Sequence, residues 1–133
     1  MRYPERMTRR TAILVSLSAL VIAACSGGSS GPSTEGLSES ALRGLELSQA
    51  KGCASCHGSD FGGGTGPTWQ GIVGTTAALR GGSSVVVDRD YLVESIVNPD
   101  AKKRVGYAAQ MPMVNLTDDE VAAIVDYIEA LSQ

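Results

Sequence analysis

Apolar residues recur at helical spacing in three segments of the chain, and a good helix-capping residue precedes each segment. The first segment, residues 39–53, follows Ser38 and carries Leu42 and Leu45 on one face. A serine at this position accepts a hydrogen bond from a free backbone N–H of the first turn. The sequence therefore predicts a helix over 39–53, which Gly52 weakens near its end.

The second and third segments begin in the same way. Asp88 precedes residues 89–97, and Pro99 stops that helix because the residue before a proline avoids helical geometry. Thr117 and Glu120 form a capping box before the third helix. The apolar positions of this third helix are Val121, Ile124, Val125, Ile128 and Leu131.

Long segments separate these helices: two are glycine-rich, at 59–71 and 80–87, and a third covers 102–115. Loops of this length in a small domain need something to fold around. The chain has one Phe and one Trp, so the three helices alone would form a marginal core, and a large apolar cofactor would complete it. Residues 85–87, "VVV", could form a short strand, but nothing obvious pairs with it. The predicted class is therefore all-α.

The first 24 residues have the layout of an export signal. Basic residues precede an apolar run at 12–24, which is too short to span a bilayer. "LVIAAC" resembles the lipobox of bacterial lipoproteins, in which Cys25 would carry the lipid; the alternative is an ordinary signal peptide with an incidental cysteine. The prediction is a signal over 1–24, a flexible Gly/Ser-rich tether over 25–36 and a folded domain over 37–133.

The net charge and the predicted export restrict the partners of the protein and the roles of its cysteines. The net charge is −3, and residues 1–24 hold four of the 11 basic residues and one of the 14 acidic ones, so the rest carries −6. This balance argues against nucleic acid or an anionic membrane surface as a partner. Outside the cytosol, Cys53 and Cys56 would form a disulfide, bind metal or carry a covalent attachment.

The stretch "GCASCHG", residues 52–58, holds Cys53, Cys56 and the only histidine, His57. C-x-x-C-H is the attachment signature of c-type haem. Residues three apart share a helix face, so both thiols can bond to one porphyrin edge while His57 turns to the iron. A thioredoxin-like site lacks its βαβ setting and a zinc site lacks further ligands, whereas a plain disulfide remains an alternative.

The second axial ligand of the iron would be a methionine or a lysine. Alternatively the iron would have no second protein ligand and would keep an open position. After residue 24 the methionines are Met111 and Met113, both in the segment before the last helix. We favour Met111, because Pro112 after it would stiffen the loop.

Five ordered blocks between residues 44 and 131 carry a family resemblance. They are "GCASCHG", "GPTWQG", "DYLVESIVNPDA", "GYAAQMP" and "LTDDEVAAIVDYIEAL". Together they resemble a class I cytochrome c, most of all the cytochrome c domain at the C-terminus of bacterial haem-copper oxidase subunit II. The chain has none of the extra cysteines and histidines of that subunit's copper domain, so it would be a stand-alone lipoprotein.

The resemblance implies an all-α fold of three to five helices around one covalently attached haem with its iron. His57 and Met111 would be the axial ligands. Pro67 would offer its carbonyl to the second ring nitrogen of His57, and Trp69 and Tyr107 would line the haem pocket. The first and last helices would cross near Gly44, Leu47, Ile124 and Tyr127. Ser48, where relatives often carry an aromatic residue, would loosen that crossing.

These features lead us to expect a membrane-tethered monohaem carrier of single electrons, not an enzyme, on the periplasmic side of the cell envelope. Its partners would be redox proteins such as a terminal oxidase or a quinol-oxidising complex. The alternatives are a haem enzyme or gas sensor with a labile methionine, and the electron-entry subunit of a larger oxidoreductase. The basic cluster consists of Lys102, Lys103 and Arg104. It is either an ordinary charged surface or a docking patch for an acidic partner. Arg80 or Arg89 would pair with a haem propionate.

Overall fold

The computed structural model describes residues 34–133, and these form four helices and one small sheet. The helices are α1 (Glu39–Ala50), α2 (Ala54–His57), α3 (Arg89–Val97) and α4 (Asp118–Ala130), and the strands are β1 (Thr76–Ala78) and β2 (Ser84–Val86). The signal, Cys25 and most of the tether fall outside the described residues. Within residues 34–133, no helix combines the length and the apolar character needed to cross a bilayer.

The caps expected from the sequence begin the three main helices. The Ser38 hydroxyl accepts a hydrogen bond from the Ala41 N–H, and the Asp88 carboxylate accepts one from Tyr91. At α4 the capping box is complete, because Thr117 and Glu120 each accept a bond from the other's backbone N–H. These three predictions are confirmed, although α1 ends at Ala50, three residues before the predicted end.

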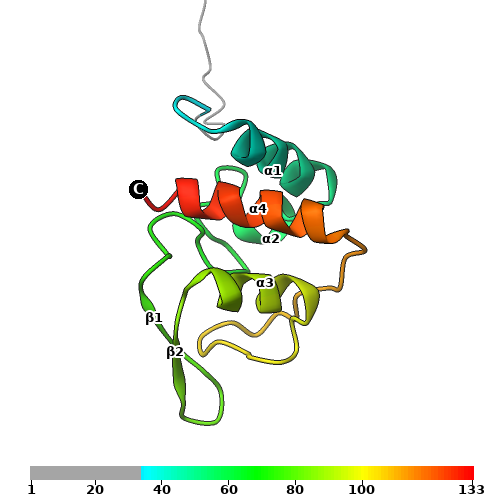
Figure 1. Ribbon diagram of the computed structural model, residues 1–133. Coiled ribbons are helices and arrows are strands. Elements are labelled where there is room, and N and C mark those ends of the chain that lie inside the picture. The colour runs from blue at the N-terminus through cyan, green and yellow to red at the C-terminus, as the bar shows by residue number, and fades with distance from the viewer. Residues whose placement is uncertain (1–33) are drawn as a thin grey trace, which may run out of the picture.

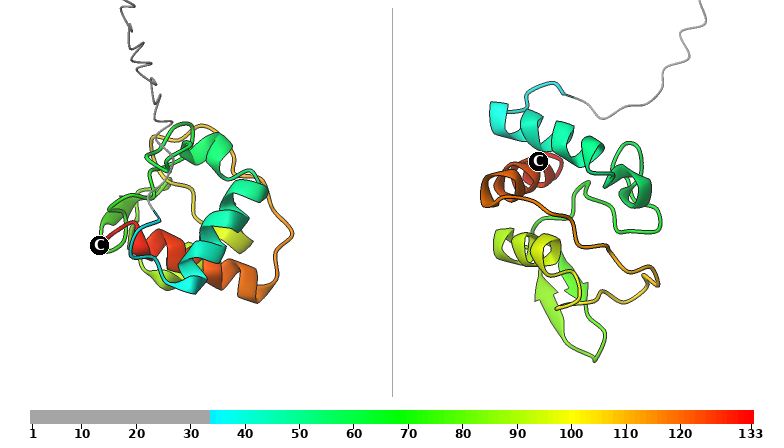
Figure 2. Two further views of the ribbon diagram at one scale, coloured as in Figure 1. Left: turned by 90° about the horizontal axis from the view of Figure 1, so that it is seen from above. Right: turned by 90° about the vertical axis from the view of Figure 1, so that its right-hand side faces the viewer.

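Helix α4 lies between α1 and α3 in both side views (Figures 1 and 2). Its apolar face supplies much of the core, with Val121, Ile124, Val125, Tyr127 and Ile128 all buried. The Arg89 guanidinium at the start of α3 pairs with Asp126 at 2.8 Å and Glu129 at 2.7 Å on α4. The described domain is thus stacked in helical layers, with α4 in the middle.

Helices α1 and α4 meet at Gly44. A Cβ atom on Gly44 would lie 1.9 Å from the Ala123 carbonyl oxygen and 2.9 Å from the Tyr127 Cβ. Only a residue without a side chain permits this approach. The expected crossing at Gly44 and Tyr127 is therefore confirmed.

Ser48 packs into this crossing without loosening it. Its side chain is buried, and its hydroxyl donates a 2.7 Å hydrogen bond to the Gly44 carbonyl. The adjoining Tyr127 is also fully buried, and its hydroxyl has no hydrogen-bond partner among the described residues. Burial raises the pKa of Tyr127 to about 12, so the phenol stays neutral.

The two-stranded sheet corrects one expectation. Strand β2 contains Val85 and Val86, and it pairs antiparallel with β1, with Ala77 opposite Val85. The prediction that nothing pairs with "VVV" is wrong. The partner strand, "TAA", has weak strand propensity and gives no signal of its own. The turn depends on Gly81 and Gly82, whose φ angles of 97° and 90° suit glycine.

We expect Gly44→Ala to lower the free energy of unfolding by about 1–3 kcal/mol, because the new methyl group forces α1 away from α4. In an exposed helix the same change would stabilise by about 1 kcal/mol. Urea unfolding of the holoprotein measures the difference. Gln49→Ala, at an exposed position of α1, is the control and should stay within about 0.5 kcal/mol. A Gly44→Ala protein as stable as the wild type would contradict the close crossing.

Candidate functional site

The C-x-x-C-H segment follows directly from the end of α1. Gly52 takes a φ of 81°, which turns the chain out of the helix, and the Cys53 N–H then bonds to the Ser48 carbonyl at 2.9 Å. The short helix α2 carries Cys56 and His57, and the His57 N–H bonds to the Cys53 carbonyl at 3.0 Å. The motif is therefore held against the C-terminal end of α1.

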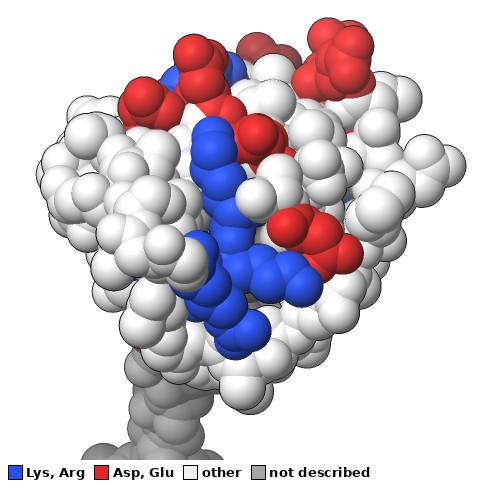
Figure 3. All heavy atoms as spheres, turned by 90° about the horizontal axis from the view of Figure 1, so that it is seen from below, with Lys and Arg blue, Asp and Glu red and all other residues white. Residues whose placement is uncertain are grey.

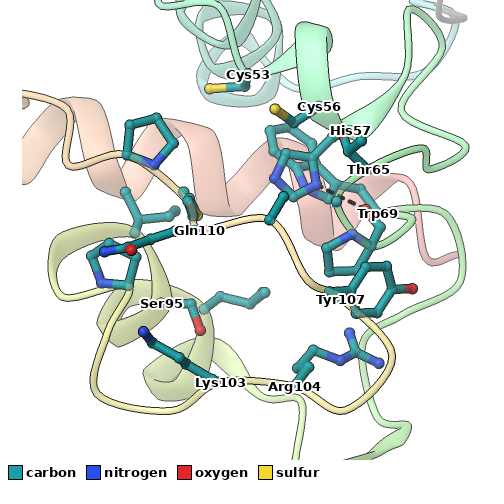
Figure 4. Close-up of a pocket in the computed structure, with 18 of the residues that line it drawn as sticks. Cys53, Cys56, His57, Thr65, Trp69, Ser95, Lys103, Arg104, Tyr107 and Gln110 are labelled. Carbon is teal, nitrogen blue, oxygen red and sulfur yellow. Dashed lines mark hydrogen bonds between the residues drawn. The ribbon is translucent and has the colours of Figure 1, made fainter.

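Both thiols line the same side of a cavity (Figure 4). Cys53 and Cys56 are free and half-buried, so the disulfide alternative is not what the structure shows. Burial raises the pKa of the Cys53 thiol, with a smaller contribution from the neighbouring Cys56. Two thiols one helical turn apart on one cavity edge suit attachment of a single ligand through two sulfur atoms.

His57 is fixed by one hydrogen bond. Its imidazole is 8% exposed, and Nδ1 lies 2.8 Å from the carbonyl oxygen of Pro67, as expected from the sequence. A carbonyl only accepts, so Nδ1 carries the proton and Nε2 keeps its lone pair for a metal. Burial lowers the pKa of His57, since desolvation disfavours the imidazolium, while the Pro67 carbonyl acts weakly in the opposite direction. Burial therefore favours the neutral ring, and the hydrogen bond to Pro67 orients it.

A glycine-rich loop wraps closely around this imidazole. The Gly63 N–H bonds to the His57 carbonyl, and the Gly66 N–H bonds to the Cys56 carbonyl, both at 2.8 Å. A Cβ on Gly66 would lie 3.0 to 3.2 Å from three atoms of the imidazole ring. The loop is therefore glycine-rich because its backbone packs against α2 and His57 directly.

Aromatic side chains also pack near the imidazole. The Trp69 ring lies 5.0 Å from the His57 ring and stacks on Phe61 at 4.4 Å, and Tyr127 meets Phe61 edge-on at 5.3 Å. Trp69 is 6% exposed and lines the cavity, so it both packs the core and shields the site. Tyr107 also lines the cavity, half-buried.

The cavity encloses about 350 Å³, a size typical of cofactor sites. Apolar side chains from α3 and α4 form part of its wall, among them Leu92, Ile96 and Ile128. Met111 lines it too and packs against the core. Met113, by contrast, is 79% exposed and lies outside this cavity. The structure therefore brings only one of the two candidate methionines to the site of His57.

Basic side chains gather on the face seen from below, with acidic side chains beside them (Figure 3). In the basic cluster, Lys102 pairs with Glu94, and Lys103 pairs with Asp100 at 3.0 Å. All three residues of the cluster also line the cavity, as does Arg80. Arg89 does not line the cavity, because its guanidinium pairs with Asp126 and Glu129 on α4. The expectation that Arg89 pairs with a haem propionate is therefore wrong.

The residues around the cavity fit a c-type haem. Two thiols and an imidazole nitrogen face an apolar space, which are the groups needed for two covalent bonds and one axial bond to such a group; the Met111 thioether lines the same space. In addition, the Ser95 hydroxyl lines this cavity and is buried without a hydrogen-bond partner among the described residues. A buried hydroxyl is normally bonded, so its orphan state is consistent with a polar ligand group at that place.

Comparison with known families agrees with this geometry. The cytochrome c family model matches residues 41–132, which is most of the chain. The chain belongs to the cytochrome c family. Its cofactor is haem c with its iron, and Cys53, Cys56 and His57 make up the C-x-x-C-H motif of covalent attachment. A comparison with curated proteins gives no match.

Family membership also supports a role in electron transport. When bound, haem supplies the one-electron couple of its iron. The chain's own residues hold the group at two sulfurs, orient an imidazole and exclude water with aromatic and aliphatic side chains. Sequence reasoning missed Gly66 and Ser95, since neither a loop glycine nor a helix serine carries a local signal of its contact with the site.

We expect Gly66→Ala to disturb His57 without removing the haem. The methyl group would push the imidazole by a few tenths of an ångström and weaken its bond to Pro67, at a cost of about 1 kcal/mol in stability. A weaker bond leaves the imidazole less basic, so the midpoint potential should rise. Redox titration and urea unfolding of the holoprotein measure the two effects.

Gly62→Ala is the matched control for this change. It lies in the same loop, but its Cβ would meet only the side chain of Asp60, which is exposed and can move. Its potential should equal that of the wild type. If Gly66→Ala also leaves the potential unchanged, the packing of the loop does not tune His57.

Proposed function

We propose that this protein is a membrane-tethered carrier of single electrons, with Met111 as the second axial ligand opposite His57. The observation that carries the proposal is that Met111 and His57 line one cavity from separate segments of the chain. Met113 is 79% exposed and offers no comparable contact. Two protein ligands leave no free position for a substrate, so the site favours electron transfer over catalysis.

Methionine opposite histidine also favours a high reduction potential, because a thioether stabilises the ferrous state. The low exposure of His57 and Trp69 adds to this effect, since a site shielded from water disfavours the more highly charged ferric state. A high potential suits a carrier that delivers electrons towards a terminal oxidase.

The rim of the cavity near the two thiols suits electron exchange with a protein partner. Apart from Lys51, which pairs with Glu120 at 3.8 Å, the exposed rim residues there and in the Met111 loop are small or uncharged: Ser55, Thr65, Ala108, Ala109, Gln110 and Pro112. Such side chains let a partner approach closely without desolvating a charge. The partners we propose are respiratory redox proteins, such as a terminal oxidase or a quinol-oxidising complex.

The tether follows from the N-terminal sequence. Cys25 in "LVIAAC" would carry the lipid on the periplasmic side of the cell envelope, and residues 25–36 would form the leash. A Gly-rich leash of this length reaches roughly 20 Å, enough for the domain to turn towards a partner near the membrane.

We expect Met111→Ala to abolish the weak long-wavelength absorbance band of sulfur-ligated ferric haem and to leave the covalent haem attached. The ferrous-to-ferric ratio at a fixed applied potential should fall at least tenfold, which is about 59 mV for a one-electron couple. Visible spectra and redox titrations of the purified holoprotein measure both.

Met113→Ala is the control and should keep the band and the potential of the wild type. Loss of the band in Met113→Ala, with its survival in Met111→Ala, would overturn the ligand assignment. The haem enzyme or gas sensor would instead be favoured if the ferric wild type lacks the band and the ferrous wild type binds carbon monoxide rapidly.

We expect Cys25→Ser to release the protein from the membrane fraction of a bacterial host that processes lipoproteins. The wild type should stay in the membrane pellet after a high-salt wash, because an acyl anchor does not depend on charge. Ser26→Ala should behave as the wild type. A wild type found in the soluble periplasmic fraction would support the ordinary signal peptide instead.

A further inference from the structure

The segment that carries Met111 has little backbone support. Residues 108–116 form neither helix nor strand, and they make no backbone–backbone hydrogen bond with any part of the described chain. Before this segment, the Val105 N–H bonds to the Ala78 carbonyl at 2.9 Å, and after it α4 begins at Asp118. Met111 therefore depends on packing and on side-chain hydrogen bonds for its position.

Two side-chain hydrogen bonds tie this segment to the rest of the described domain. The Gln110 side-chain amide donates to both carboxylate oxygens of Asp100, at 2.9 and 3.1 Å. The Lys51 ammonium donates to the Asn115 carbonyl at 3.4 Å, which is long for such a bond. The shorter contact is the one beside Met111, because Gln110 directly precedes it in the chain.

The acceptor of the Gln110 bond lies on a fixed turn after α3. The Ala101 N–H bonds to the Asn98 carbonyl at 3.0 Å, and Pro99 between them has a restricted φ angle. The Lys103 ammonium also pairs with the Asp100 carboxylate, at 3.0 Å. Asp100 therefore offers its oxygens from a defined position at the end of α3.

This hydrogen bond lies at the edge of the cavity. Asp100, Gln110 and Met111 all line the cavity, and Figure 4 shows Gln110 on its wall. A bond to an ionised carboxylate is stronger than one between neutral groups. The Asp100 side chain is 53% exposed, however, so water competes for its oxygens. The contact thus favours one position of the segment and can still open.

We propose that Asp100 and Gln110 form a latch that holds Met111 at the cavity. While the latch is closed, the backbone next to Met111 is tied to the end of α3, and the thioether stays at the site. When the latch opens, residues 108–112 can move away and take the thioether with them. The inference rests on the proposed function, because it takes Met111 to be the second axial ligand. Asp100 and Gln110 are positioning residues, since they act through Met111.

The latch sets how often the Met111 position is open to an external ligand. Such a ligand binds only the open state, so its apparent dissociation constant is the intrinsic constant divided by the open fraction. A weaker latch raises the open fraction and lowers the apparent constant by the same factor. The latch therefore protects an electron carrier from small molecules that would occupy the site.

The test is the affinity of added imidazole for the ferric holoprotein, measured by the loss of the long-wavelength band. Gln110→Glu places a second carboxylate against Asp100, and the apparent dissociation constant of imidazole should fall about tenfold. Gln110→Ala only removes the bond and should lower the constant about fivefold.

The reverse pair, Asp100→Asn with Gln110→Glu, distinguishes the latch from a general disturbance of the loop. It exchanges donor and acceptor without changing the length of either side chain, and it keeps the summed charge of the pair. The dissociation constant should return to within about twofold of the wild type, because the same contact forms with its polarity reversed.

Glu94→Gln is the matched control. Glu94 is a carboxylate of α3 that pairs with Lys102, and the hydrogen bonds of Gln110 go to Asp100 instead. Its constant should equal that of the wild type. The proposal is overturned if both Gln110 variants keep the wild-type constant, if Glu94→Gln shifts it as much, or if the reverse pair binds imidazole as tightly as Gln110→Glu alone.

A failure of the Met111 assignment gives a different result. The ferric wild type would then lack the long-wavelength band, and imidazole would bind the wild type and Met111→Ala equally tightly, which overturns both proposals. A failure of the latch alone leaves the band in the wild type and a large difference in imidazole affinity between these two proteins.

Discussion

The close crossing of α1 and α4 at Gly44 is the contact on which the site depends. Because α1 is pressed against Ala123 and Tyr127, its C-terminal end has a fixed position, and the chain that leaves it at Gly52 delivers Cys53 to a defined place. The same α4 supplies Ile128 to the cavity wall. The position of the attachment motif and one part of the cavity wall therefore depend on this helix pair.

Around this pair, the irregular segments carry most of the chemistry. The loop 58–66 orients His57, the segment 104–112 brings Tyr107 and Met111 to the cavity, and the hairpin positions Arg80. None of these segments has a helix of its own, and each is held by a few backbone hydrogen bonds and by the cavity it surrounds. A haem in that cavity would act as the missing part of the core, consistent with the small number of aromatic residues.

Local sequence signals predicted the helices well, since caps at Ser38, Asp88 and Thr117 act within a single turn. The haem motif was equally local. The hairpin was missed because "TAA" has no strand signature, and only tertiary pairing makes it a strand. The place of the Ser95 hydroxyl at the cavity was beyond the sequence, because it depends on how α3 packs in the finished fold.

The central claim is that His57 and Met111 close the iron between them and leave it to exchange electrons only. X-ray absorption at the iron edge of the purified ferric holoprotein tests it most directly, because sulfur and light-atom ligands scatter differently. The account predicts one sulfur in the first coordination shell beside the porphyrin and imidazole nitrogens. A shell of nitrogen and oxygen alone, or one with an open position, would contradict it.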